Sequence, residues 1–106
     1  MVIYNVTVSI DDDVHQDWLQ WMQEVHIPEV MATGFFLESR MSKILGYEEG
    51  GISYSIQYLC ENHDVLERYQ LEQAPRLQAE HTSRFQGKFA AFRTLLDVCQ
   101  IFENKD

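Results

Sequence analysis

Two histidines, His26 and His81, are the residues of this chain best suited to do chemistry. Imidazole changes its charge near neutral pH, so a histidine can act there as a general acid or a general base. Glu29 lies one helical turn after His26, and Arg76 lies in the segment that leads to His81. If folding brings the two segments together, these groups can perform acid–base catalysis. We therefore take His26 and His81 as the candidate catalytic residues.

A structural role is the simpler interpretation of both histidines. His81 shares an apolar stripe with Leu77 and Phe85, where a histidine is more often a hydrogen-bonded core residue than a catalyst. His26 lies at the rim of the apolar face of its helix, two residues before Pro28. It could bind the backbone carbonyls that a proline leaves without a partner. The sequence favours these structural roles over catalysis.

Aromatic side chains near the histidines could wall a cleft for a small apolar or aromatic ligand. The candidate cleft residues are Trp21, Tyr54, Tyr58 and Tyr69, together with the charged Glu29 and Arg76. Trp21 shares the apolar stripe of the first predicted helix with Trp18, so core packing is the alternative role for both tryptophans. The two tyrosines of the third predicted strand alternate inward, and their hydroxyls could reach a cavity or the edge of the core.

Other chemistries lack residues at the spacing they need. The four histidines include no HxxxH pair, and no serine or cysteine stands in a nucleophile-elbow sequence. Gly50-Gly51 reads as a turn rather than a phosphate-binding loop. Cys60 and Cys99 have no second cysteine near them, and we expect both to be reduced and buried. The sequence predicts no metal site and no cofactor.

The acidic balance of the chain restricts its partners. There are 17 Asp and Glu residues against 8 Lys and Arg residues, which gives a net charge of −9. Such a charge repels phosphate, so neither nucleic acid nor an anionic membrane is an expected partner. The N-terminus has no basic and long apolar run typical of a signal peptide, and we expect the protein in the cytoplasm.

Apolar periodicity divides the chain into four strands and two helices. The predicted strands cover residues 2–10, 35–45, 52–60 and 91–102, and residues 46–51 form a hairpin turn. The first helix follows the aspartates at 11–13, which suit its start, and ends or kinks at Pro28 before a short turn over 29–32 and Gly34. The second helix starts at Asn62 or Asp64 and kinks at Pro75. The last predicted strand is apolar on both faces and should be covered on both.

The order βαββαβ predicts an α+β protein with a ferredoxin-like fold. Its antiparallel sheet has the strand order 4-1-3-2, and both helices cover one face. We expect a single domain over residues 1–103 and a disordered tail at 104–106. We also expect the two helices to run in the same direction, which would place His26 about 20 Å and His81 about 26 Å along their helices, at a similar depth.

The other face of the predicted sheet carries too many apolar side chains among its polar ones to remain exposed to water. Its centre carries Asn5, Thr7, Ser53, Ser55 and Gln57, and the fourth strand would add Leu95, Cys99 and Ile101 beside them. Pairing two such faces would bury the apolar side chains. We therefore expect a homodimer that forms a dimeric α+β barrel.

Several short motifs together resemble an uncharacterised bacterial family of single-domain proteins of this length, known as a domain of unknown function. The motifs are Tyr4–Val8, Trp18–Pro28, Thr33-Gly34, Tyr54–Tyr58, Glu67–Tyr69, Ala74–Leu77, Arg84-Phe85 and Phe92–Thr94. The resemblance implies a ferredoxin-like, dimeric α+β barrel and supplies no activity. The wider group of such barrels includes cofactor-free monooxygenases and haem-degrading enzymes, which implies a ligand cleft between helices and sheet.

Two functions remain open. The absence of a catalytic motif favours a non-catalytic homodimeric binding or interaction module. The alternative is a small cofactor-independent enzyme or small-molecule-binding protein with a helix–sheet cleft, as in the monooxygenase-like barrels. A filled interface between helices and sheet would support the first, and a cavity of several hundred Å³ with a histidine in its wall would support the second.

Overall fold

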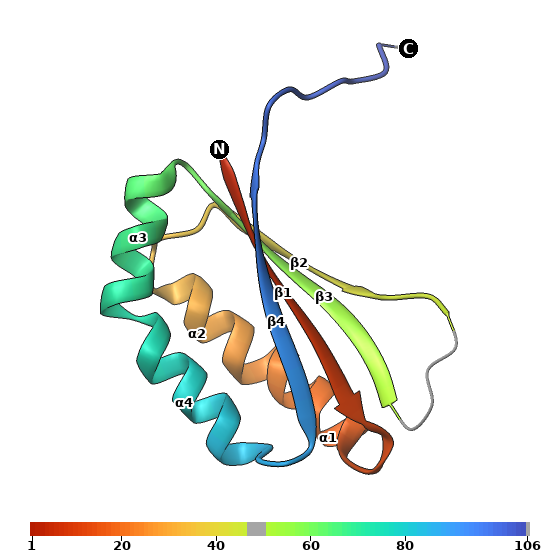
Figure 1. The fold of residues 1–106 in the computed structure, drawn as a ribbon. Helices are drawn as coiled ribbons and strands as arrows, with labels where there is room; N and C mark the ends of the chain where they lie inside the picture. The colour runs from red at the N-terminus through yellow and green to blue at the C-terminus, as the bar shows by residue number, and fades with distance from the viewer. Residues whose placement is uncertain (47–50, 106) are drawn as a thin grey trace.

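A four-stranded antiparallel sheet with helices on one face makes up the protein (Figure 1). The computed structural model describes residues 1–46 and 51–105, so most of the turn expected at 46–51 lies outside the described residues. The strands are β1 (Val2–Asp11), β2 (Glu38–Lys43), β3 (Gly51–Cys60) and β4 (Phe89–Asp97). Their order, β2-β3-β1-β4, is the predicted order 4-1-3-2 read from the other edge. The ferredoxin-like fold is thereby confirmed.

Most of the buried apolar side chains that the sheet contributes to the core lie on its two central strands. β1 and β3 pair antiparallel along their whole length, and Tyr4 lies opposite Tyr58. Side chains alternate across a strand, so Tyr4, Val8 and Ile10 all point toward the helices, where they are buried. Predicted and observed bounds differ by no more than one residue for these two strands, because their alternation is clean.

The first helical stretch runs without a break through Pro28. It consists of a short 3-10 turn (Asp12–Val14), α1 (His15–Trp21), a π-helical turn (Met22–His26) and α2 (Ile27–Ala32). The predicted end at Pro28 and the turn over 29–32 are therefore wrong. The wide π turn directly before Pro28 accommodates a residue that has no N–H to donate. The helix ends instead before Gly34, whose φ of +81° is typical of a glycine just beyond a helix C-terminus.

The second helical stretch bends where the sequence predicted. α3 (His63–Glu72) and α4 (Ala74–Arg84) meet at Gln73, and Pro75 lies in the first turn of α4. Asn62, rather than Asp64, caps α3, because its Oδ1 accepts a hydrogen bond of 2.9 Å from the Val65 N–H. The aspartates before the first helix behave differently, since Asp11 makes no capping hydrogen bond with its side chain.

The two helical stretches run in opposite directions, which corrects the expected parallel arrangement (Figure 1). Each stretch follows one of the central strands, and β1 and β3 are antiparallel. The chain therefore enters its two helices from opposite ends of the sheet. Two residues at similar distances from the starts of their helices, as expected for His26 and His81, are consequently not placed at similar depths by that distance alone.

The fourth strand is shorter than predicted. It ends at Asp97, and the chain then leaves the sheet as an extended segment without regular structure (Figure 1). Two further expectations fail in this segment. Cys99 is exposed, while Cys60 is buried, and both thiols are free. Leu95 lies opposite Tyr4 on the helix side of the sheet, so the open face instead carries Phe92 and Leu96 of β4.

The Asn62 cap gives a test of how α3 begins. Asn62→Ala removes the acceptor of the Val65 N–H and should lower the free energy of unfolding by about 1 kcal/mol, as measured by urea denaturation. Glu61→Ala, one residue earlier and equally exposed, is the matched control and should stay within about 0.5 kcal/mol of the parent. Equal effects of the two substitutions would contradict the assigned cap.

Candidate functional site

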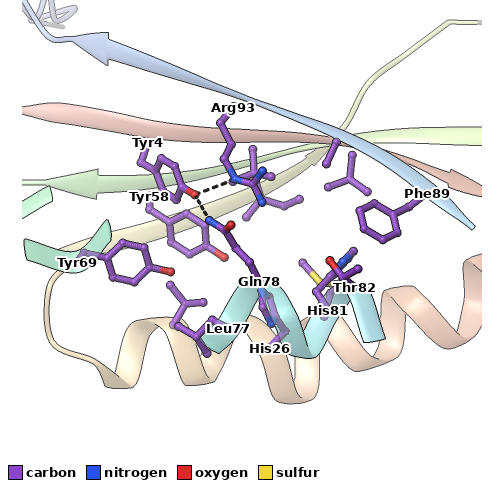
Figure 2. Close-up of a pocket in the computed structure, with 16 residues that line it drawn as sticks. Tyr4, His26, Tyr58, Tyr69, Leu77, Gln78, His81, Thr82, Phe89 and Arg93 are labelled. Atoms are coloured by element: carbon purple, nitrogen blue, oxygen red, sulfur yellow. Dashed lines mark hydrogen bonds between the residues drawn. The ribbon is translucent and has the colours of Figure 1, made fainter. Parts of the chain in front are cut away.

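A small cavity of about 50 Å³ lies between the sheet and the helices. Figure 2 shows its walls, which come from β1, β3 and β4 on one side and from the helices on the other. Its polar lining consists of His26, Tyr4, Tyr58, Tyr69, Gln78, His81, Thr82 and Arg93. Thr82 and Arg93 are exposed to solvent, so the mouth of the cavity lies between α4 and β4.

Tyr4, Gln78 and Arg93 form a hydrogen-bonded corner of the cavity (Figure 2). The Tyr4 hydroxyl oxygen accepts from Arg93 Nε at 3.1 Å and from Gln78 Nε2 at 3.5 Å. A phenol oxygen has two lone pairs and one proton. Because both lone pairs have a donor, the Tyr4 O–H proton can be given to a further acceptor. The terminal guanidinium nitrogens of Arg93 are not used in this contact.

Tyr58 and Tyr69 add two neutral hydroxyls beside this corner. Burial, together with the neighbouring tyrosines, raises the pKa of the Tyr58 hydroxyl far above its usual range. Burial and the nearby Tyr4 likewise raise the pKa of Tyr69. Both side chains therefore keep their protons at any physiological pH, and they can serve a ligand as hydrogen-bond donors.

The structure fixes the proton position on His81. Its side chain is 8% exposed, and Trp18 Nε1 donates to His81 Nε2 over 2.9 Å. An indole N–H can only donate, so His81 Nε2 must be unprotonated, and the neutral ring carries its proton on Nδ1. Burial lowers the pKa of His81 to about 4, with further contributions from His26 and Arg93. His81 is thus both the hydrogen-bonded core residue that the sequence predicted and a part of the cavity wall.

The π-helical turn brings His26 to the cavity. The N–H of Ile27 bonds to the carbonyl of Met22, five residues back, so side chains five apart lie over one another. His26 accordingly stacks on Trp21, with ring centroids 5.0 Å apart, and faces His81 at 5.8 Å. Regular α-helical spacing would leave His26 at the rim of the helix face, as the sequence predicted.

His26 Nδ1 is buried and has no hydrogen-bond partner among the described residues. The expected bond from this nitrogen to carbonyls freed by Pro28 is therefore not found. Burial lowers the pKa of His26 to about 4, although the Glu80 carboxylate opposes that shift. A neutral imidazole with an unused nitrogen in a cavity wall is available to a ligand or to a bridging water.

The structure brings together only part of the predicted cleft. His26, His81, Tyr58 and Tyr69 line the cavity. Four other candidates do not, namely Trp21, Tyr54, Glu29 and Arg76. Trp21 packs behind His26.

Tyr54 lies elsewhere in the core, and Glu29 and Arg76 lie on the outer side of the helices. The Tyr54 hydroxyl is 2.7 Å from His15 Nε2, and its ring packs against Trp18. Arg76 forms an exposed ion pair of 3.4 Å with Glu80. Desolvation and a hydrogen bond to Glu80 raise the pKa of Glu29. These residues do not reach the cavity.

Four polar lining residues were not predicted, namely Tyr4, Gln78, Thr82 and Arg93. Tyr4 could have been found, because it alternates inward on β1 as Tyr58 does on β3. Arg93 also lies on the helix side of its strand, two residues after Ala91, but a single arginine in an apolar strand gives no signal of a cavity. Gln78 follows the buried Leu77 on α4 and carries no signal of its own.

No cluster of three or more His, Cys, Asp or Glu side chains able to hold a metal ion occurs within residues 1–46 and 51–105. None of the helices in the described part of the chain is long and apolar enough to cross a membrane.

The strand order, with the helices on one face of the sheet, defines a small α+β protein with a ferredoxin-like fold. The chain belongs to the family described as "Domain of unknown function (DUF4286)", whose sequence model matches residues 1–99. No curated protein matches the chain. The family resemblance expected from the sequence is confirmed.

Solved structures of low sequence identity share the fold. A dimeric ferredoxin-like protein from an uncultured marine organism is 9% identical, with a TM-score of 0.72 over 98% of this chain and 100% of the other. A candidate antibiotic biosynthesis monooxygenase from Deinococcus radiodurans is 16% identical, with a TM-score of 0.69 over the whole of both chains. SnoaB, a cofactor-independent oxygenase from Streptomyces nogalater, is 10% identical, with a TM-score of 0.68 over 97% of this chain and 98% of the other.

The two buried histidines should make stability depend on pH. In the unfolded chain they bind protons near pH 6.5, but in the folded protein only near pH 4. Stability is therefore complete above pH 6.5 and falls as the pH drops toward 4, by roughly 3 kcal/mol per histidine. Urea denaturation at pH 7 and pH 4.5 should show this loss. In the double variant His26→Gln/His81→Gln most of it should disappear, and an unchanged pH dependence would contradict the burial of neutral histidines.

Proposed function

We propose that this protein is a homodimer that binds a small molecule in the cavity between its sheet and its helices. The observation that carries the proposal is the convergence of polar groups on that cavity. A buried imidazole nitrogen of His26 has no partner, and the Tyr4 hydroxyl has a proton to give, although buried polar groups are normally satisfied. A ligand would complete both groups.

The size of the cavity restricts the ligand. A volume of about 50 Å³ is far below the several hundred Å³ named above as support for a helix–sheet cleft, so the cavity as it stands has no room for a large aromatic ligand. It corresponds to about four water molecules, or to an organic molecule of similarly few non-hydrogen atoms. A larger ligand requires the mouth between α4 and β4 to widen. The small volume supports a compact ligand rather than a polycyclic one.

Binding without turnover fits the described groups better than catalysis does. His81 cannot take a proton on Nε2 while Trp18 donates to that atom, and Tyr58 and Tyr69 stay protonated because burial raises their pKa values. The second candidate is a cofactor-independent enzyme in which His26 Nδ1 serves as the base. SnoaB, which has the same fold, is named as a cofactor-independent oxygenase. The low pKa of His26 makes it a weak base, so we place binding first.

The open face of the sheet supports pairing of two copies. Phe92 and Leu96 are 63% and 41% exposed there. Three residues at the polar centre of the face are already hydrogen-bonded to one another, since Ser55 Oγ donates to Asn5 Oδ1 at 2.5 Å and Asn5 Nδ2 donates to Thr7 Oγ1 at 3.1 Å. Burying polar groups that already have partners costs little. Two-fold pairing of such faces would bury the apolar side chains of both copies.

The dimer is tested by light scattering after size-exclusion chromatography. The parent protein should have twice the mass of one chain at micromolar concentration. Leu96→Asp places a charge in the proposed interface and should shift the mass toward that of a monomer. Leu71→Asp, on the exposed side of α3, is the matched control and should leave the dimer intact. A monomeric parent protein would overturn the dimer.

The ligand site is tested by filling the cavity. Ala91→Leu places a larger side chain in the cavity wall, whereas Ala79→Leu changes the exposed side of α4. A panel of small acids, amides, alcohols and phenols should include compounds that shift the backbone amide signals of Gln78 and Arg93 in NMR spectra. Ala91→Leu should lower affinity for them at least tenfold, and Ala79→Leu should not. If no panel compound binds and mass spectrometry of natively purified protein finds no small molecule, the proposal fails.

A further inference from the structure

We propose that the ligand of this cavity is a small hydroxycarboxylate, with its carboxylate held at the corner formed by Arg93, Tyr4 and Gln78 and its hydroxyl directed toward His26. This inference rests on the proposed function and names the chemical class of ligand that the cavity would select. Figure 2 shows the contact between Tyr4 and Arg93 toward the strands and His26 toward the helices. Three features support it: the charge of the lining, the free donors of Arg93 and the unpartnered Nδ1 of His26.

The chain as a whole is acidic, but among the described residues the only charged side chain in the lining of the cavity is a basic one. The chain carries 17 acidic and 8 basic residues, yet the cavity is lined by one arginine and by no aspartate or glutamate. Both lining histidines are neutral at pH 7. Most other polar groups there can donate a hydrogen bond, including three tyrosine hydroxyls and the hydroxyl of Thr82. A wall of donors with one positive charge suits an anion that is rich in acceptor oxygens.

Arg93 is the cation that would meet the carboxylate. Arg68, Arg76, Arg84 and Lys88 each form an ion pair with an acidic residue. Among the ion pairs of residues 1–46 and 51–105, none involves Arg93. Its Nε is bound to Tyr4, which holds the guanidinium at the cavity corner and leaves its terminal nitrogens free. A guanidinium can bind a carboxylate through two parallel hydrogen bonds, which a neutral amide cannot match.

Tyr4 and Gln78 complete the anion corner. The Tyr4 oxygen accepts from both neighbours, so its own proton is available as a further donor. A carboxylate oxygen placed there would accept from Tyr4 and from Arg93 at the same time. Hydrogen bonds with one charged partner are worth more than neutral ones. This difference is the reason to expect discrimination between an acid and its amide.

His26 offers the ligand a buried hydrogen-bonding nitrogen. Its Nδ1 has no partner and its ring is uncharged, so in the tautomer that carries the proton on Nε2 this nitrogen accepts a hydrogen bond. A carboxylate has no proton to offer at pH 7, whereas a hydroxyl on the same molecule has one. His81, whose ring faces His26 at 5.8 Å, carries its proton on Nδ1 and can donate to the oxygen of that hydroxyl. The two histidines can therefore bind one hydroxyl from both sides.

Four probes of nearly equal size test the inference: acetate, glycolate, acetamide and glycolamide. Affinities are measured by NMR titration at pH 7 and constant ionic strength. Acetate should bind about tenfold more tightly than acetamide, and glycolate about fivefold more tightly than acetate. In Arg93→Gln the preference for acids over amides should disappear. In His26→Phe the preference for glycolate over acetate should disappear, while the preference for acids remains.

Controls separate this inference from the proposed function. Arg68→Gln removes a cation that is paired with Glu72 outside the cavity, and it should change none of the preferences. Arg93→Lys keeps the charge and should retain part of the preference for acids, which distinguishes loss of the anion corner from misfolding. Amides that bind as well as acids would overturn the inference and leave the site standing. If none of the four probes binds, the inference is also overturned, and the wider panel described above then decides whether the cavity binds anything.

Discussion

The buried hydrogen bond from Trp18 to His81 organises the site. It joins the two helical stretches across the core, from α1 to α4, over 2.9 Å. Because an indole can only donate, this bond keeps His81 neutral and directs its proton to the other ring nitrogen. A charged His81 would lose the bond and would have to be buried without an anionic partner, which is costly. The neutral state of His81 in the cavity wall thus depends on its hydrogen bond with Trp18 in the core.

The second constraint is the π-helical turn at Met22–His26. A turn with one additional residue moves the following side chains around the helix axis, so His26 stacks on Trp21 and faces His81. The same turn lets the helix continue through Pro28 to cover the sheet. π turns of this kind occur frequently at functional sites, because they place a side chain where a regular helix would not. Here the turn puts an unpartnered imidazole nitrogen into a cavity wall.

Much of the fold could be predicted from the sequence, because local patterns carry it. The alternation along β1 and β3 and the order of elements were sufficient for the strand order and for the layer of helices. The failures came from interactions that no local pattern reports. Pro28 was expected to end a helix that a π turn continues, and Leu95 was assigned to the wrong face of β4. The site shows the same division: Tyr58 and Tyr69 followed from periodicity, but the contact of Arg93 with Tyr4 joins residues at opposite ends of the chain.

The state of the two imidazoles is the central claim of this account, and long-range proton–nitrogen NMR correlations of the histidine rings test it most directly. At pH 7 we predict that His81 is neutral, with an unprotonated Nε2 and a protonated Nδ1, and that both histidines remain neutral down to pH 5. A compound that binds in the cavity should change the signal of His26 Nδ1. A protonated Nε2 on His81 at pH 7, or charging of both rings near pH 6.5, would contradict the account.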